Sequence, residues 1–279
     1  MSIAEGLTKI VDKEQQAIEF NRRIGQTVTG SNVTLSDNAD NIERLNEQLE
    51  QTLYGADTGG KSYYDTFWDN LQDNGSRRDY QYMFDKGWND TIFKPKYDII
   101  FGNSYQGAQV FWNSGIQDLK GILESQGVSL VTTDATRFLQ LFQNSKITNI
   151  PTIDMSNGTE SSGYAFSSSA IKNIDKIISS ENTIYESTCF NGASALTHVI
   201  FDGTIGTTLN IKWSTELDTE SIVSIIEALS PTTSDLSVTL SKTAVNSMVF
   251  PITSEKTNIT YNNWDELAGT KTNWTISLV

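Results

Sequence analysis

A phenylalanine-led pattern of apolar positions recurs along the middle of the chain. Each copy begins with a phenylalanine, and apolar residues follow it five, eight and eleven positions later. Copies begin at Phe111, Phe142 and Phe166, and a fourth copy, with one extra residue before Leu196, begins at Phe190. The steps between these phenylalanines are 31, 24 and 24 residues, a period typical of stacked repeats. Because one turn cannot bury its own phenylalanine and isoleucines, the pattern predicts a solenoid whose neighbouring turns share a continuous core.

The first sixty residues carry two narrow apolar stripes on otherwise polar helices. Members of a stripe are three or four residues apart: Ile3, Leu7 and Ile10 in the first, and Ile42, Leu45 and Leu49 in the second. Stripes this narrow usually pair with copies of themselves in a coiled coil or a small bundle. We therefore expect residues 1–60 to form a helical region for oligomerisation and attachment.

Residues 61–110 are rich in aromatic side chains, and we expect them to form an N-terminal cap on the repeats. Most of these rings are expected to close one end of the core. A second possibility is that some of them are exposed and stack against sugars. The candidate ligand-binding residues of this kind are Tyr63, Tyr64, Trp88 and, just beyond the cap, Trp112.

The C-terminal part of residues 111–279 has a different rhythm from the repeats. Asp218 or Thr219 can cap a helix that carries Ile222, and Pro231 stops that helix. Residues 236–240 and 274–279 alternate between apolar and polar side chains, which predicts strands. We expect this end to extend the repeat sheet and seal it as a C-terminal cap.

Composition and charge narrow the class of function. The formal net charge is −14, so the average field of the protein repels DNA and anionic lipid headgroups, and we expect neither nucleic acid nor membrane insertion. No apolar run approaches the roughly 18–20 residues of a membrane span, and the N-terminus does not resemble a secretory signal. One cysteine and one histidine leave no basis for a disulfide or for the usual zinc sites.

No motif for catalysis or for a cofactor emerges from the chain. Residues 55–62 fit the phosphate-binding pattern G-x-x-x-x-G-K-[ST], but a helical pattern rather than a strand precedes them, so we interpret them as a flexible linker. His198 and Cys189 lie within the repeats and are expected to be structural. The sequence nominates no pair of carboxylates, although 34 acidic residues leave a glycosidase pair possible. We therefore expect no enzyme, no cofactor and no metal.

The repeat resembles the BspA-like leucine-rich repeats of bacterial surface proteins and phage-encoded proteins. In that family phenylalanine often follows a small residue, and cysteine or serine follows the phenylalanine three positions later, as Ser114, Ser145 and Ser169 do here. Further blocks are similar to tail-associated proteins from phages and prophages of gut Gram-positive bacteria: residues 3–10, 67–75, 93–100, 118–123, 221–230 and 272–276. The resemblance implies an α+β fold in which N-terminal oligomerising helices precede a leucine-rich-repeat solenoid with a helix–strand C-terminal cap.

The resemblance also implies a function. It places the protein in the virion, at the tail tip, in the baseplate or in a tail fibre, after synthesis in the cytoplasm of the bacterial host. There it would act as a receptor-binding adhesin, forming a homotrimer and contacting other tail or baseplate proteins and a host cell-surface glycan or protein. Two alternatives stay open: a structural head fibre or connector without a receptor, and a glycan depolymerase.

Overall fold

A computed structural model describes residues 83–84, 87–101 and 108–279. The chain divides into two units, Met1–Thr66 and Phe67–Val279, and all described residues belong to the second unit. The predicted oligomerisation residues Ile3, Leu7, Ile10, Ile42, Leu45 and Leu49 and the candidate binding residues Tyr63 and Tyr64 lie outside the described residues. The expectations for them stay predictions.

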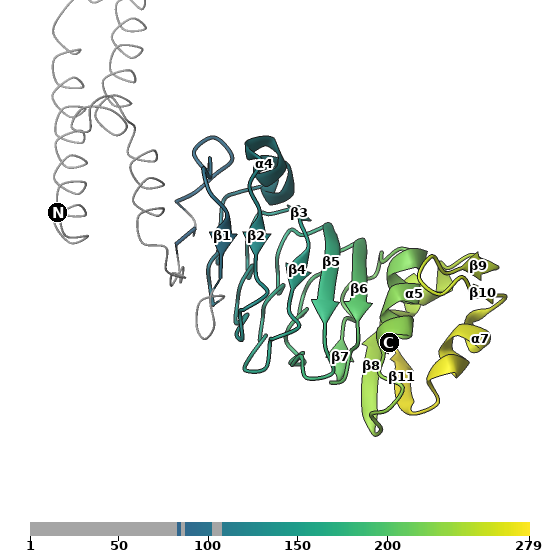
Figure 1. Ribbon diagram of the computed structural model, residues 1–279. Helices are drawn as coiled ribbons and strands as arrows, with labels where there is room; N and C mark the ends of the chain where they lie inside the picture. The colour runs from purple at the N-terminus through teal and green to yellow at the C-terminus, as the bar shows by residue number, and fades with distance from the viewer. Residues whose placement is uncertain (1–82, 85–86, 102–107) are drawn as a thin grey trace, which may run out of the picture. The chain divides into compact units, whose positions relative to one another are not determined.

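Short parallel strands and one helix form the first half of the described unit (Figure 1). Strand β1 pairs with β2, and β5 pairs with β3, β4 and β6, all in parallel. The pairing places equivalent positions of successive repeats side by side, as in the row Ile150, Ile174 and Val199. The elements are β1 (Ile99–Ile100), α4 (Leu119–Gln126), β2 (Leu130–Val131), β3 (Asn149–Ile150), β4 (Ile153–Asp154), β5 (Asn173–Ser179) and β6 (His198–Gly203).

The second half contains a separate sheet and a hairpin. Strand β8 lies between β7 and β11 in a parallel sheet, whereas β9 and β10 form an antiparallel pair. Helix α5 packs against β6, and Figure 1 shows the β9–β10 pair beyond α5. The elements are β7 (Leu209–Asn210), α5 (Thr219–Ala228), β8 (Leu236–Leu240), α6 (Lys242–Asn246), β9 (Ile252–Thr253), β10 (Thr260–Tyr261), α7 (Trp264–Ala268), the 3-10 helix η2 (Gly269–Lys271) and β11 (Trp274–Leu278).

The phenylalanines of the repeat are stacked inside the core. Successive ring centroids are 5.2 Å apart between Phe111 and Phe142, 5.8 Å between Phe142 and Phe166, and 4.8 Å between Phe166 and Phe190. Phe84 extends the stack, with its centroid 5.3 Å from that of Phe111. All five rings are buried. The prediction that neighbouring turns bury their phenylalanines against one another is confirmed, and Phe84 is an additional member that the pattern did not indicate.

Backbone hydrogen bonds join each turn to the next. The amide of Phe111 donates to the Leu141 carbonyl at 2.9 Å, and the amide of Phe142 donates to the Ala165 carbonyl at 2.7 Å. Two residues after each phenylalanine the backbone takes a left-handed conformation, at Asn113, Asn144, Ser168 and Gly192. Glycine and asparagine adopt this conformation at low cost, which explains their use at these turns.

A further turn follows the four that the sequence pattern indicates. Ile211 occupies the place of the phenylalanine, is fully buried and donates its amide to the Thr239 carbonyl at 2.9 Å. Ser214 follows three residues later and donates its hydroxyl to the Ala193 carbonyl at 2.9 Å. The pattern missed this turn because isoleucine replaces phenylalanine and the step from Phe190 is 21 residues.

The predicted leucine-rich-repeat solenoid with a helix–strand C-terminal cap is wrong as a description of the fold. The described residues form a mixed α/β fold with several small sheets, few helices and no closed barrel. The predicted strands at 236–240 and 274–279 appear as β8 and β11, but they do not extend the repeat sheet, because β7 pairs with β8 and not with β6. The spacing of apolar residues specifies which side chains are buried, whereas strand length and pairing also depend on the turns between them.

Candidate functional site

The two candidate binding residues that the structure describes are both half-buried. Trp88 meets Phe84 edge-on, with centroids 5.4 Å apart, and meets Phe93 in the same way at 5.9 Å. Trp88 therefore packs at the aromatic end of the core. Trp112 directly follows the stacked Phe111 and is also half-buried.

A row of polar side chains crosses several turns. Asn149 donates to Asp118 at 3.2 Å, and Asn173 donates to Asn149 at 2.8 Å. His198 is paired with Asn173 in the parallel register, and its Nδ1 lies 2.7 Å from Oδ2 of Asp218. His198 is therefore held at the end of this row by the Asp218 carboxylate.

Asp218 joins this row to helix α5. Its Oδ1 accepts hydrogen bonds from the amide of Ser221 at 2.8 Å and from the Ser221 hydroxyl at 2.6 Å, as an N-cap residue does. Burial raises the pKa of Asp218, but the hydrogen bonds from Ser221 and His198 outweigh burial and hold the pKa below its ordinary value. The ionised form is therefore the one that the folded state favours.

Replacing Asp218 with alanine is expected to lower the free energy of unfolding by about 1 kcal/mol at pH 7, because the cap of α5 is lost. Since the folded pKa of Asp218 is lowered, its contribution is present above the unfolded pKa of about 3.9 and is lost as the pH falls through the folded value. Urea denaturation at pH 7 and pH 3 measures both effects. The difference between the wild type and Asp218→Ala is expected to shrink at pH 3, and a constant difference would contradict this assignment.

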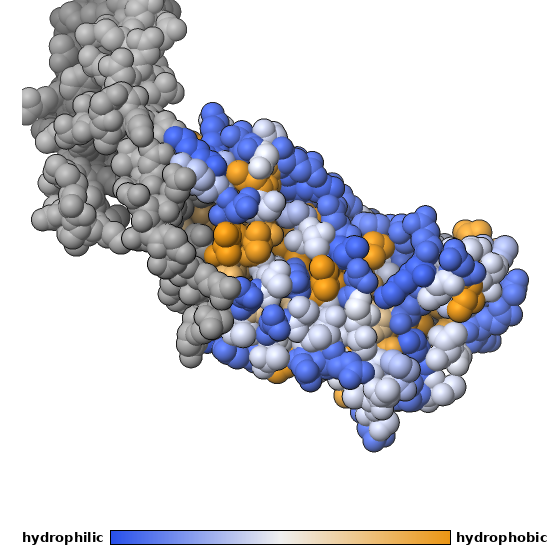
Figure 2. Space-filling model, viewed as in Figure 1, coloured by the Kyte–Doolittle hydropathy of each residue, from blue (hydrophilic) through white to orange (hydrophobic). Residues whose placement is uncertain are grey.

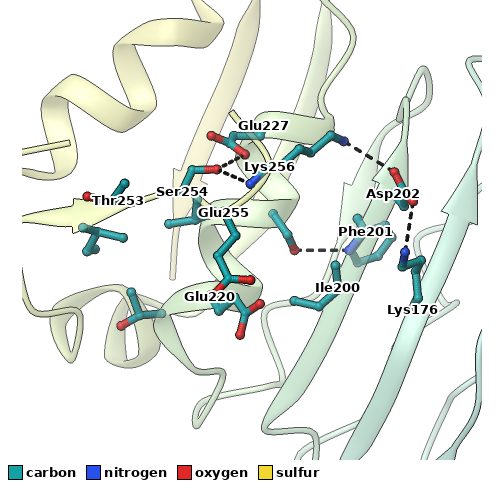
Figure 3. Close-up of a pocket in the computed structure, with 14 residues that line it drawn as sticks. Lys176, Ile200, Phe201, Asp202, Glu220, Glu227, Thr253, Ser254, Glu255 and Lys256 are labelled. Carbon is teal, nitrogen blue, oxygen red and sulfur yellow. Dashed lines mark hydrogen bonds and ion pairs between the residues drawn. The ribbon is translucent and has the colours of Figure 1, made fainter. Parts of the chain in front are cut away.

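A pocket of about 500 Å³ opens between β6, α5 and the segment from β9 to Lys256 (Figure 3). Because its walls come from residues as far apart as Lys176 and Lys256, only the fold brings them together. The lining contains both apolar and charged side chains. Pockets of about 300–1,000 Å³ are typical of small-ligand sites.

One wall of the pocket is built around Asp202. Its Oδ2 lies 3.2 Å from the ammonium of Lys176, and its Oδ1 lies 3.8 Å from the ammonium of Lys256. The hydrogen bond from Lys176 lowers the pKa of Asp202. All three side chains are partly exposed, so the ammonium and carboxylate groups remain accessible to a ligand.

Glu227 attaches the β9–β10 segment to α5. Its carboxylate accepts hydrogen bonds from the hydroxyls of Ser254 at 2.8 Å, Thr257 at 2.7 Å and Tyr261 at 2.9 Å. Burial, followed by the interaction with Glu227, raises the pKa of Tyr261, so its hydroxyl remains a donor at neutral pH. These three bonds give Glu227 a structural role and fix one wall of the pocket.

The two remaining carboxylates of the pocket differ from those of Asp202 and Glu227 in their contacts. Glu220 and Glu255 are exposed, and neither side chain forms a hydrogen bond or an ion pair within the part of the chain that the structure describes. Figure 3 shows both side chains directed away from Asp202. The same lining includes the apolar side chains of Ile200, Val223 and Ile252. The pocket can therefore offer acceptors, donors and apolar contact together.

The sequence did not indicate this pocket. Its charged residues lie on a strand, a helix and a hairpin, and no spacing along the chain connects them. Within residues 83–84, 87–101 and 108–279, no group of three or more histidine, cysteine, aspartate or glutamate side chains is arranged to hold a metal ion. Among the same residues, no helix combines the length and apolar character needed to cross a bilayer.

No protein-family model, no curated protein and no solved structure matches the chain. The resemblance of its repeats and sequence blocks to phage tail proteins therefore stays a prediction, and so does the function that the resemblance implies.

Proposed function

We propose that the chain is a structural protein of a phage tail tip, baseplate or tail fibre that acts as an adhesin on the surface of its bacterial host. In this proposal the protein is part of the virion and forms a homotrimer through residues 1–60. Its partners are other tail or baseplate proteins and a host glycan or surface protein. The resemblance of the repeats and sequence blocks supports the class, and the surface of the turns supports the binding role.

The observation that carries the proposal is a stack of five buried phenylalanine rings beneath turns with polar outward residues. One of these turns and the further turn of Ile211 also present aromatic side chains: Tyr164 precedes Phe166 by two residues and is 38% exposed, and Trp213 follows Ile211 by two residues and is 46% exposed. On the face that Figure 2 shows, hydrophobic residues occupy small separate patches among hydrophilic ones. Hydroxyl and amide groups exchange hydrogen bonds with sugar hydroxyls, and aromatic rings can stack on sugars.

Binding of the full-length purified chain to whole cells and to a glycan array tests the adhesin proposal. We expect binding to a subset of Gram-positive gut strains and to a glycan that those strains display. Binding is expected to gain strength with the number of copies, because several weak contacts add through multivalency. Absence of binding to every strain, together with normal incorporation into particles, would favour a structural head fibre or connector without a receptor.

A glycan depolymerase is a second candidate function because Glu220 and Glu255 both line one pocket. Glycoside hydrolysis uses two carboxylates, one as the acid and the other as the base or nucleophile. Incubation of the full chain with the glycan that it binds separates the two functions. Shortened sugar chains whose formation depends on Glu220 and Glu255 would favour the enzyme, whereas binding without shortening favours the adhesin.

A further inference from the structure

We infer that the pocket between β6, α5 and the β9 segment binds one hexose unit of a neutral sugar or an amino sugar. The biological role of this site rests on the proposed adhesin function, but the binding itself can be measured separately.

The lining provides the two kinds of contact that a sugar ring requires. A pyranose ring presents C–H groups on its faces and hydroxyls around its edge. Ile200, Val223 and Ile252 offer apolar surface for the ring, and the charged side chains around them can reach the hydroxyls. A volume of about 500 Å³ leaves room for a single sugar unit together with water.

The polar groups match hydroxyls because both donors and acceptors are present. The ammonium groups of Lys176 and Lys256 each carry three protons, and their contacts with Asp202 do not use all of them. Glu220 and Glu255 provide acceptors that no described residue occupies. A sugar hydroxyl can donate to a carboxylate and accept from an ammonium at the same time.

The charge of the pocket selects among sugars. Its lining contains two lysines, Lys176 and Lys256, and four carboxylates, Asp202, Glu220, Glu227 and Glu255. The two lysines lie beside Asp202, and Glu220 and Glu255 have no cationic partner in the described part of the chain. Negative charge in excess repels an anionic sugar such as a uronic acid and attracts a protonated amine.

The pocket wall is fixed before a ligand arrives. Glu227 holds Ser254, Thr257 and Tyr261 through three hydrogen bonds, and these residues flank the β9 segment that forms the wall. A site that is already ordered loses less conformational entropy on binding. This order favours measurable affinity for a single sugar unit, although we expect the affinity to be weak.

Calorimetric titration of the full-length chain with glucose, N-acetylglucosamine, glucosamine and glucuronate tests the inference. We expect at least one of the first three sugars to bind and glucuronate to bind more weakly than the neutral sugars. Thr253→Trp places a large ring at an exposed lining position and is expected to abolish binding. Thr243→Trp, an exposed position on α6 outside the lining, is the matched control and is expected to bind as the wild type does.

A double variant tests the role of charge in the same pocket. Glu220→Gln with Glu255→Gln is expected to weaken glucosamine binding about tenfold or more, because charge-assisted hydrogen bonds are lost, and to affect glucose less. Glu216→Gln, on the exposed loop before α5, changes the charge of the chain outside the lining and serves as the control. Equal losses for glucosamine in the double variant and the control would overturn the selective role of the pocket charge.

Cell adhesion by the same variants separates this inference from the proposed function. If only the wild type binds sugar in calorimetry but Thr253→Trp adheres to host cells equally well, the sugar site in the pocket stands, and the adhesin function uses another surface. If the sugars bind in the pocket but the chain adheres to no host strain, the site stands, and the adhesin function is contradicted. Absence of binding of all four sugars by the wild type would overturn the inference.

Discussion

Replacing Phe166 with alanine is expected to lower the free energy of unfolding by about 3–5 kcal/mol. Phe166 lies between Phe142 and Phe190, with centroids 5.8 Å and 4.8 Å away, and its side chain is buried. The substitution removes contacts on both faces of the ring and leaves a cavity that neighbouring turns can fill only in part. Urea denaturation followed by circular dichroism measures the loss.

Two further variants serve as comparisons for Phe166→Ala. Phe166→Leu keeps a large apolar side chain and is expected to lose less stability than Phe166→Ala. Trp213→Ala removes an aromatic ring from a position that is 46% exposed and is expected to change stability by about 0.5 kcal/mol or less. A loss below about 1 kcal/mol for Phe166→Ala would contradict the stacked core.

Replacing Gly203 with alanine is expected to lower the free energy of unfolding by about 1–3 kcal/mol. Gly203 ends β6 with φ of 84°, and a Cβ atom there would lie 2.1 Å from the Ser179 carbonyl oxygen. Ser179 and Gly203 are partners in the β5–β6 pairing, so the backbone of one strand must move. The same denaturation measurement tests this expectation.

Gly269→Ala is the matched control for Gly203→Ala. Gly269 has φ of −63°, and nothing lies within 4 Å of a Cβ atom built there. Alanine at such a position is expected to leave stability unchanged or to raise it slightly, because it restricts the unfolded chain. Equal effects of the two substitutions would show that the close approach of β5 and β6 does not govern the cost.

The core of the repeats was predictable because its signal is periodic. Phenylalanine and the isoleucines that follow it at fixed steps specify which side chains face inward, and Phe111, Phe142, Phe166 and Phe190 are buried as that pattern requires. The helix of Ile222 was predictable from its own apolar spacing and its cap, and it appears as α5. The spacing of apolar residues and the capping residue of the helix were therefore sufficient to predict this part of the fold.

The parts that were missed depend on information that a local pattern does not hold. Phe84 is 27 positions before Phe111, a step like those between the other copies, but Asn89 stands five positions later, where the pattern requires an apolar residue. Strands β6 and β7 belong to different sheets, although the pattern predicts that the C-terminal strands extend the repeat sheet. The spacing of apolar residues does not encode how the chain turns between these two strands. The pocket depends on tertiary contact between Asp202, α5 and the β9 segment, and no spacing along the chain reveals such a contact.

The hydrogen bonds between successive turns have a mechanical consequence. They run from one turn to the next, as from Phe142 to Ala165 and from Phe166 to Cys189, so tension along the direction of stacking loads them in series. Under such tension the turn with the weakest attachment detaches first, and the load then passes to its neighbour. The protein would lengthen stepwise under a pull and would absorb work at each step.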